Sequence, residues 1–320
     1  MSDGPVVGRS PWPDARELAE QLVADSGQSV KAVLLYGSRL QKTNPDKHSA
    51  LDFMVLVDDY SGFYEGLSAS HELHRPRRVM TALANVLPPN VIAYAPDEGT
   101  AGIAKCLIVD KRHLARALSA DPPDHFLLGR LVQKVGYVWS ASDADEAWLR
   151  DRIAEAHAGV VEWMAPYLEG PVDAAGLGRR LLEVCYRGEI RPESRSRADR
   201  VFEAQEEHFR VALQPALDRA VEEGVMVEAD AGYRLRAPVP AAQRRRWRGH
   251  FIRSKTRTTL RWFKHIVTFA NWLPYVQRKV ERHTGRSIQL TTLERRLPII
   301  FLWPRAIHVL LTRPRREVDQ

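Results

Sequence analysis

Apolar residues along the first 140 positions cluster in short runs separated by polar turns and by segments with helical spacing. Continuous apolar runs suit buried strands, and they occur at residues 31–36, 53–57, 91–95 and 105–109. Apolar residues recur with helical spacing in other segments, namely 13–25, 76–86, 113–118 and 124–135. This order predicts an α/β (α+β) domain over residues 1–140.

The pattern changes after residue 140, where helical spacing dominates. Residues 143–224 read mostly as helix, with breaks at 166–172 and 191–196. Residues 225–235 predict a hairpin that turns at 230–232, and 237–246 (APVPAAQRRR) read as a linker. We therefore expect a mostly helical second domain over 141–240, for which a winged helix is one suitable form, and a separate region over 241–320.

The last region is basic and amphipathic. In residues 259–273 (TLRWFKHIVTFANWL), apolar side chains form a wide helical face opposite Arg257, Arg261, Lys264 and Thr268. Such a helix suits a membrane interface, but a helix packed on the core has the same pattern, and both interpretations stay open. Residues 297–311 are apolar but number only 15, fewer than the roughly 20 that span a bilayer.

Charge is distributed unevenly along the 320 residues. The net charge is +7, yet residues 241–320 hold 19 Lys/Arg against 4 Asp/Glu, and the first 240 residues hold 28 against 36. A basic tail on a weakly acidic body predicts a polyanionic partner. The high apolar content of the tail favours an anionic membrane surface, contacted through residues 257–316, over nucleic acid.

Cysteine usage and the first residues argue against several classes of protein. The two cysteines, Cys106 and Cys185, have no Cys or His at metal-ligand spacing, which disfavours a zinc site or a disulfide framework. The first residues lack the basic and apolar regions of a secretory signal. These features predict a cytoplasmic protein that associates peripherally with the inner face of the membrane.

Candidate chemistry lies where the first two predicted strands meet. The first strand ends on Gly37-Ser38, and the second begins on Asp52. Glycine lets a phosphate approach the backbone, serine adds a hydroxyl, and a carboxylate on the next strand could hold Mg²⁺ against that phosphate. A tight turn followed by a solvent-facing aspartate is the alternative, and we weigh the two equally.

Several short motifs, in order, resemble the mitochondrial-type phosphatidate cytidylyltransferase family, a branch of the nucleotidyltransferase superfamily. The matching pieces are Tyr36-Gly37-Ser38, Ala50-Leu51-Asp52-Phe53, Val57-Asp58-Asp59, Ala104-Lys105, Gly129-Arg130-Leu131, Lys134-Val135, Cys185 to Arg191, and Arg200-Val201. Ala50 replaces the first aspartate of the pair that most nucleotidyltransferases use. The resemblance covers roughly residues 31–211 and is that of a bacterial-type relative. It implies that residues 1–140 form a nucleotidyltransferase-type domain with a mixed sheet.

The resemblance implies an enzyme that joins CTP to phosphatidic acid, giving CDP-diacylglycerol and pyrophosphate with Mg²⁺ as cofactor. It implies that Asp52 binds the metal and that Lys105 acts with it in catalysis. The residues it implies for binding CTP are Gly37, Ser38, Arg130, Lys134, Arg191 and Arg200. Arg130 and Lys134 are expected to share one face of the helix at 124–135.

Two further points stay open at this stage. A second metal-binding carboxylate is not evident, because Asp58 lies about 20 Å along the strand from Asp52 and Asp110 is a weak candidate. The competing functions are another nucleotidyltransferase with a small-molecule or RNA substrate, and an inactive nucleotidyltransferase-like protein that binds a membrane or a partner.

Overall fold

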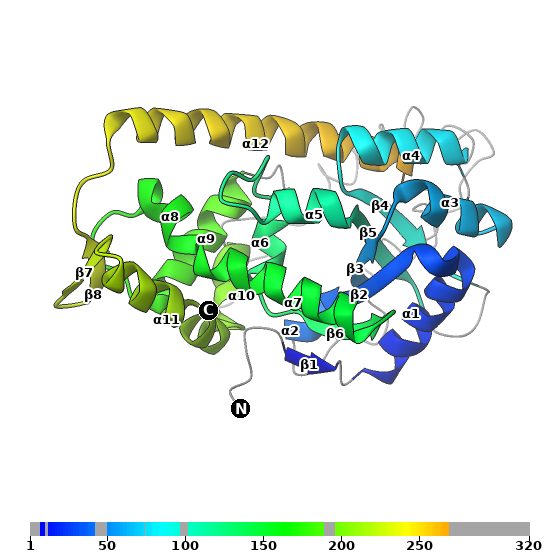
Figure 1. The fold of residues 1–320 in the computed structure, drawn as a ribbon, viewed down its shortest axis with the longest axis horizontal. Helices are drawn as coiled ribbons and strands as arrows, with labels where there is room; N and C mark the ends of the chain where they lie inside the picture. Colours follow the sequence, from blue (N-terminus) through cyan, green and yellow to red (C-terminus); the bar gives the residue numbers. More distant parts are fainter. Residues whose placement is uncertain are drawn as a thin grey trace, which may run out of the picture. The chain divides into compact units, whose positions relative to one another are not determined.

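The computed structural model describes residues 7–9, 12–41, 50–73, 75–96, 102–188 and 196–268. A compact unit extends from Met1 to Thr268, and its described part combines a mixed sheet with many helices (Figure 1). The predicted sites at Arg191 and in residues 269–320, including the apolar segment 297–311, lie outside the described residues.

The sheet has six strands in the order β1-β6-β2-β3-β5-β4. Their bounds are β1 Val7–Arg9, β2 Val30–Tyr36, β3 Leu51–Val57, β4 Asn90–Tyr94, β5 Ala104–Asp110 and β6 Gly136–Ser140. Strand β3 is antiparallel to β2 and parallel to β5. The sheet is therefore mixed, as expected, and its central strands are buried, as the apolar runs predicted, because both faces are covered.

Helices of the first 140 residues lie around this sheet. They are α1 Pro13–Ser26, α2 Ser38–Gln41, α3 Tyr60–Ala69, α4 Arg77–Val86, α5 Lys111–Ala117 and α6 Leu128–Leu131, with the 3-10 turn η1 Gly27–Ser29. The main apolar core joins α1 and α3 to one face of β2, β3 and β5. Leu18 and Leu22 of α1 meet Phe53 and Val55 of β3 in this core, and all four side chains are inaccessible to solvent.

The second part of the unit is helical and ends in a hairpin. It comprises α7 Asp143–Ala158, α8 Val160–Met164, η2 Ala165–Tyr167, α9 Ala174–Arg187, α10 Ser196–Glu203, α11 Glu206–Glu222, β7 Met226–Ala229 and β8 Gly232–Leu235. The hairpin turns at the residues the sequence predicted. The division at residues 140 and 240 stays a prediction.

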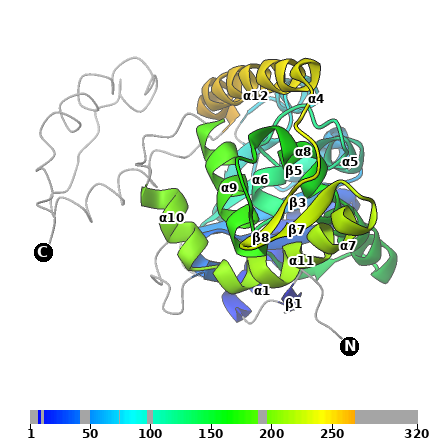
Figure 2. The same cartoon turned by 90° about the vertical axis from the view of Figure 1, so that its left-hand side faces the viewer.

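Helix α12, Ala241–Thr268, runs along one side of the unit in both views (Figures 1 and 2). It packs against β4 near its end and against η2 near its start, so it connects the sheet to the helical part. The linker predicted at 237–246 is therefore wrong in its second half, because the helix begins at Ala241. No helix within the described segments combines the length and the apolar character needed to cross a membrane.

One predicted helix is much shorter in the structure. Only Leu128–Leu131 is helical within the 124–135 segment. Backbone groups around it have other partners: Ser254 Oγ accepts from the N–H of His125 at 3.0 Å, and Gln205 Oε1 accepts from the N–H of Lys134 at 2.8 Å. Since these N–H groups are already bonded, continuing the helix would gain them nothing.

Candidate functional site

The carboxylate of Asp52 lies directly against Gly37. The two strands pair so that Tyr36 is opposite Asp52, and Gly37 leaves β2 with φ of +82°. A Cβ on Gly37 would lie 2.6 Å from Asp52 Oδ2, which is closer than real Cβ contacts allow. Glycine is thus needed here both for its backbone conformation and for the close approach of the carboxylate.

Lys105 of β5 is the in-register neighbour of Asp52 across the parallel β3–β5 pair. Its side chain is exposed. The structure therefore brings together three residues that the sequence proposed for the site, Gly37, Asp52 and Lys105, at one end of the three central strands. Ser38 follows directly as the first residue of α2.

Asp58 and Asp110 lie at the other end of these strands. Asp110 is opposite Val57 in the same register, five residues or about 17 Å beyond Lys105. Its carboxylate caps α5 by accepting from the N–H of His113 at 2.6 Å, and Asp58 pairs with Lys31 at 2.7 Å. Both carboxylates have structural partners, so neither joins Asp52.

A metal at this end of the sheet would have Asp52 as its protein carboxylate. In the described parts of the chain, no cluster of three or more His, Cys, Asp or Glu side chains could hold a metal ion. Mg²⁺ often binds through one or two carboxylates together with substrate phosphates and water. A single carboxylate at this place therefore fits an ion that arrives with a nucleotide better than a resident metal.

Arg130 and Lys134 do not share a helix face, which corrects the prediction made for them. Arg130 lies in α6, where its Nη1 donates to Phe126 O at 2.6 Å and its guanidinium carbon lies 3.6 Å from the centre of the Phe126 ring. Lys134 follows the end of α6, and its side chain lies near His208 of α11. Of the two cations, Arg130 is the one that lies against the Phe126 ring.

The Gly129 and Cys185 motifs meet in the structure. A Cβ on Gly129 would lie 2.8 Å from Cys185 Cβ, so the glycine allows α6 to pack tightly on α9. This contact explains part of the ordered motif series as packing rather than chemistry. Arg200 is exposed on α10, and its role in the site stays a prediction.

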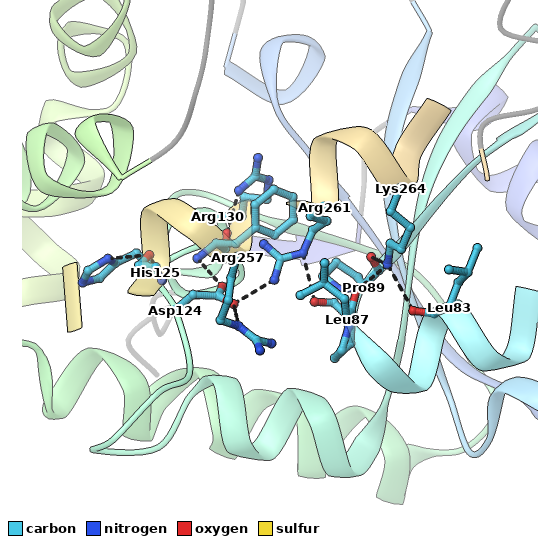
Figure 3. Close-up of polar contacts among 12 residues, drawn as sticks. Leu83, Leu87, Pro89, Asp124, His125, Arg130, Arg257, Arg261 and Lys264 are labelled. Atoms are coloured by element: carbon cyan, nitrogen blue, oxygen red, sulfur yellow. Dashed lines mark hydrogen bonds and ion pairs between the residues drawn. The ribbon is translucent and has the colours of Figure 1, made fainter. Parts of the chain in front are cut away.

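Helix α12 contributes charged side chains that the sequence did not assign to this region (Figure 3). Asp124 is buried and its Oδ2 accepts from Arg257 Nε at 2.9 Å and from Arg261 Nη2 at 2.8 Å. Burial alone would raise the pKa of Asp124, but Arg261 and Arg257 hold it below its usual range. This ion cluster of Asp124, Arg257 and Arg261 attaches α12 to the loop that precedes α6.

Lys264 makes a second buried attachment of α12. Its ammonium donates to the carbonyl oxygens of Leu87 and Pro89, the latter at 2.7 Å, just beyond the end of α4. Burial, reinforced by Arg261, lowers the pKa of Lys264 to about 6. Carbonyls at a helix C-terminus favour a cation, so they oppose this shift.

The orientation of α12 is the reverse of what amphipathic patterning suggests. Arg261, Lys264 and Thr268 are buried, whereas Leu260 and Phe263 are 54% and 56% exposed. The two faces of residues 259–268 were predicted, but the helix packs through its polar face. The helical spacing of Arg257, Arg261, Lys264 and Thr268 was the one sequence feature that could have indicated a buried polar face. The groups that accept hydrogen bonds from these side chains lie more than 130 residues away in the sequence.

His265 links α12 to the predicted site. Burial and the positive charges of Lys264, Lys105, Arg261 and Arg130 hold its pKa far below the usual range. The ring centres of His265 and Phe126 are 6.4 Å apart. Cationic residues of β5, α6 and α12 therefore all act on His265 electrostatically.

Comparisons with known proteins leave the family of the chain open. No protein-family model and no curated protein matches it. Among solved structures, a nucleotidyltransferase-like protein from Exiguobacterium sibiricum aligns over 92% of this chain and 91% of its own, with 10% identity and a TM-score of 0.27. A TM-score this low supports no conclusion about fold or function, so the functional argument depends on the geometry of the site.

Proposed function

We propose that the chain is a nucleotidyltransferase whose site is built on Gly37, Asp52 and Lys105. The observation that carries the proposal is the Asp52 carboxylate, held against a positive-φ glycine where two strands end and flanked in register by a lysine. Phosphoryl-type transfer needs mainly positioning and charge neutralisation. This arrangement offers a backbone that a phosphate can approach, a metal-binding carboxylate and a cation.

We further propose CTP and phosphatidic acid as the substrates, on the strength of the ordered motifs between residues 31 and 211. A phosphate oxygen of phosphatidic acid attacks the α-phosphorus of CTP. A new oxygen–phosphorus bond forms, the bond to the bridging oxygen breaks, and pyrophosphate leaves. Because the attacking phosphate is already ionised at neutral pH, the site needs no strong general base.

The chain's own residues have distinct roles in this proposal. Gly37 and Ser38 give the triphosphate access to the backbone, and Asp52 would hold Mg²⁺, which neutralises charge on the triphosphate and the leaving group when bound. Lys105 stabilises phosphate charge beside Asp52. Arg130, Lys134, Arg191 and Arg200 remain proposed contacts of CTP.

The outer face of α12 supports an acidic lipid surface as partner. It exposes Leu260, Trp262 and Phe263 in its last turns and Arg245 and Arg248 in its first turns. Large apolar groups and arginines exposed along one helix suit the headgroup region of an anionic membrane. In this arrangement α12 contacts the membrane with its outer face while its inner face holds the charged cluster.

The reaction is tested by incubating the purified full-length chain with each of four α-labelled NTPs, Mg²⁺ and phosphatidic acid micelles. We expect label from CTP in a lipid product, and none when phosphatidic acid is replaced by diacylglycerol, which lacks the attacking phosphate. Label transferred to RNA or to a small molecule, but not to lipid, would favour the competing nucleotidyltransferase function. No transfer with any nucleotide would favour an inactive protein.

Membrane contact is tested separately with substitutions rather than by truncation, since removing residues after 253 would also remove Arg261 and Lys264 from the interior. We expect Leu260→Asp/Phe263→Asp to lose sedimentation with anionic vesicles. Val211→Asp, which changes a similarly exposed apolar side chain on α11, should keep it. Equal binding by all three proteins would exclude this face of α12 as the contact.

A further inference from the structure

The turn that follows Gly37 is too short to hold its own position. Helix α2 is a single turn, Ser38–Gln41, in which the N–H of Leu40 donates to Gly37 O at 3.2 Å. A helix of this length has little stability of its own in water. Its place beside β2 and β3 therefore depends on what the side chains of α2 contact.

Two residues of α2 attach it to the rest of the protein. Leu40 packs against the apolar core. Arg39, the residue directly after Ser38, contacts the start of α1, where its Nη2 donates to Asp14 Oδ2 at 2.8 Å. Its guanidinium carbon also lies 5.6 Å from the centre of the Trp12 ring. Leu40 therefore holds α2 to the core, and Arg39 holds it to α1.

The ion pair between Arg39 and Asp14 is well placed to fix the turn. The side chain of Arg39 is 9% exposed and that of Asp14 is 40% exposed, and a partly buried pair is screened by salt much less than a surface pair. Asp14 lies in the first turn of α1, whose apolar side chains are buried in the same core as β3. Since β3 carries Asp52, Arg39 connects the turn to the elements that hold the carboxylate.

We propose that Arg39 is a positioning residue of the nucleotide site, which holds the backbone of Gly37 and Ser38 in its phosphate-binding place through the pair with Asp14. The inference rests on the proposed function for its ligand. Arg39 acts through α2 and does not touch the nucleotide, because its guanidinium is directed to α1. A turn that is ordered before the nucleotide arrives avoids an ordering cost on binding, so loss of the pair lowers affinity.

The role is tested by calorimetric titration of the full-length chain with CTP and Mg²⁺ in the absence of an acceptor. Arg39→Met keeps an apolar stem but loses the ion pair, and we expect it to weaken CTP binding at least tenfold. Arg39→Lys keeps a cation that can pair with Asp14 and should bind within threefold of wild type. Arg16→Gln is the matched control and should also bind within threefold, because Arg16 pairs with Glu20 on the same helix with both side chains more than half exposed.

A double-mutant cycle with Asp14→Asn distinguishes positioning from direct contact. Asp14→Asn alone should weaken CTP binding about as much as Arg39→Met does, and Arg39→Met should add less than threefold in the Asp14→Asn background, because the pair is already broken. A further tenfold loss in that background would mean that Arg39 binds the nucleotide itself. That result, equal losses in Arg39→Met and Arg39→Lys, or CTP binding by Arg39→Met within threefold of wild type would each overturn the positioning role. If Arg39→Met does not fold, as judged by circular dichroism, Asp14→Asn decides the question.

Kinetics in the transfer assay separate this inference from the proposed function. Arg39→Met should raise KM for CTP at least tenfold and keep kcat within threefold, because Asp52 and Lys105 stay in place on their strands. A merely structural role would instead lower kcat with the folded fraction and leave KM unchanged, which would refute the positioning role alone. CTP binding that depends on Arg39, in a chain that transfers no nucleotide, would refute the proposed reaction but leave the positioning role.

Discussion

Replacing Asp124 by asparagine should loosen α12 from the rest of the unit. Asp124 is 4% exposed and accepts hydrogen bonds from Arg257, Arg261 and the N–H of Phe126, the last at 3.0 Å through Oδ1. An asparagine keeps one oxygen but directs an N–H₂ group or a neutral oxygen at two guanidinium groups. Arg261, which is almost fully buried, then has no compensating charge from this carboxylate.

The expected cost follows from the burial of this pair. Removing one partner of a buried ion pair typically destabilises a protein by about 3–5 kcal/mol, and Asp124→Asn should fall in this range. Asp121→Asn is the matched control, because Asp121 lies in the same loop and pairs with Arg246 of the same helix, with both side chains about two-thirds exposed. Exposed pairs contribute about 0–1 kcal/mol.

The assay is equilibrium unfolding in urea, followed by far-ultraviolet circular dichroism and tryptophan fluorescence. Arg261→Gln should lower the cost of Asp124→Asn in a double-mutant cycle, because it removes the charge that asparagine leaves uncompensated. A cost below about 1 kcal/mol for Asp124→Asn, or equal costs for Asp124→Asn and Asp121→Asn, would refute this account of how α12 is attached.

Two further predictions concern backbone conformation and buried histidines. Gly37→Ala should abolish transfer by displacing Asp52, and full activity in this variant would contradict the close contact. Gly27 has φ +70° and ψ −158° with open space around it, a conformation essentially restricted to glycine, so Gly27→Ala should cost on the order of 1–3 kcal/mol and keep activity. Burial, with His208 beside it, lowers the pKa of His157 to about 4 from 6.5, so the unfolded chain binds a proton that the folded chain does not. Stability should therefore fall as pH drops from 6.5 to 4, by roughly 3 kcal/mol for this group, and urea unfolding of His157→Gln over that range should lack this part of the slope.

The central strands and the Gly37–Asp52 contact could be predicted from the sequence, because both depend on local features. Continuous apolar runs produced β2, β3 and β5 in nearly the predicted bounds. A strand that ends in Gly-Ser and a neighbour that begins with a carboxylate meet wherever the two strands pair antiparallel. That pairing needs no information beyond the order of the elements.

Strand β6 was not predicted, and its sequence explains why. It reads GYVWS, and only its first two residues are buried. It is held in the sheet by pairing with β2 on one side and with β1 on the other. Those contacts are non-local, so the five residues alone carry little signal.

The inward polar face of α12 was missed for a similar reason. Hydrophobic patterning places the apolar residues of a helix toward the core. Helix α12 instead turns its polar face inward, because buried acceptors bind its cationic side chains. These are the Asp124 carboxylate and the carbonyls of Leu87 and Pro89. Nothing near α12 in the sequence indicates that they exist, so the ion cluster of Asp124, Arg257 and Arg261 became visible only in the fold.

The central claim, that Asp52 binds the metal of a nucleotidyl-transfer site, is tested most directly by the rate of label transfer from CTP to phosphatidic acid in Asp52→Asn and Asp58→Asn. Both substitutions remove one carboxylate from the β3 region, at opposite ends of the strand. We expect Asp52→Asn to lose at least a hundredfold in rate, about 2.7 kcal/mol of transition-state stabilisation, with an unchanged circular dichroism spectrum. Asp58→Asn should stay within about threefold of wild type, since it loses only partly exposed pairs, with Lys31 and Lys111. Retention of more than about a tenth of the wild-type rate by Asp52→Asn, a loss of under 1.4 kcal/mol, would contradict the claim.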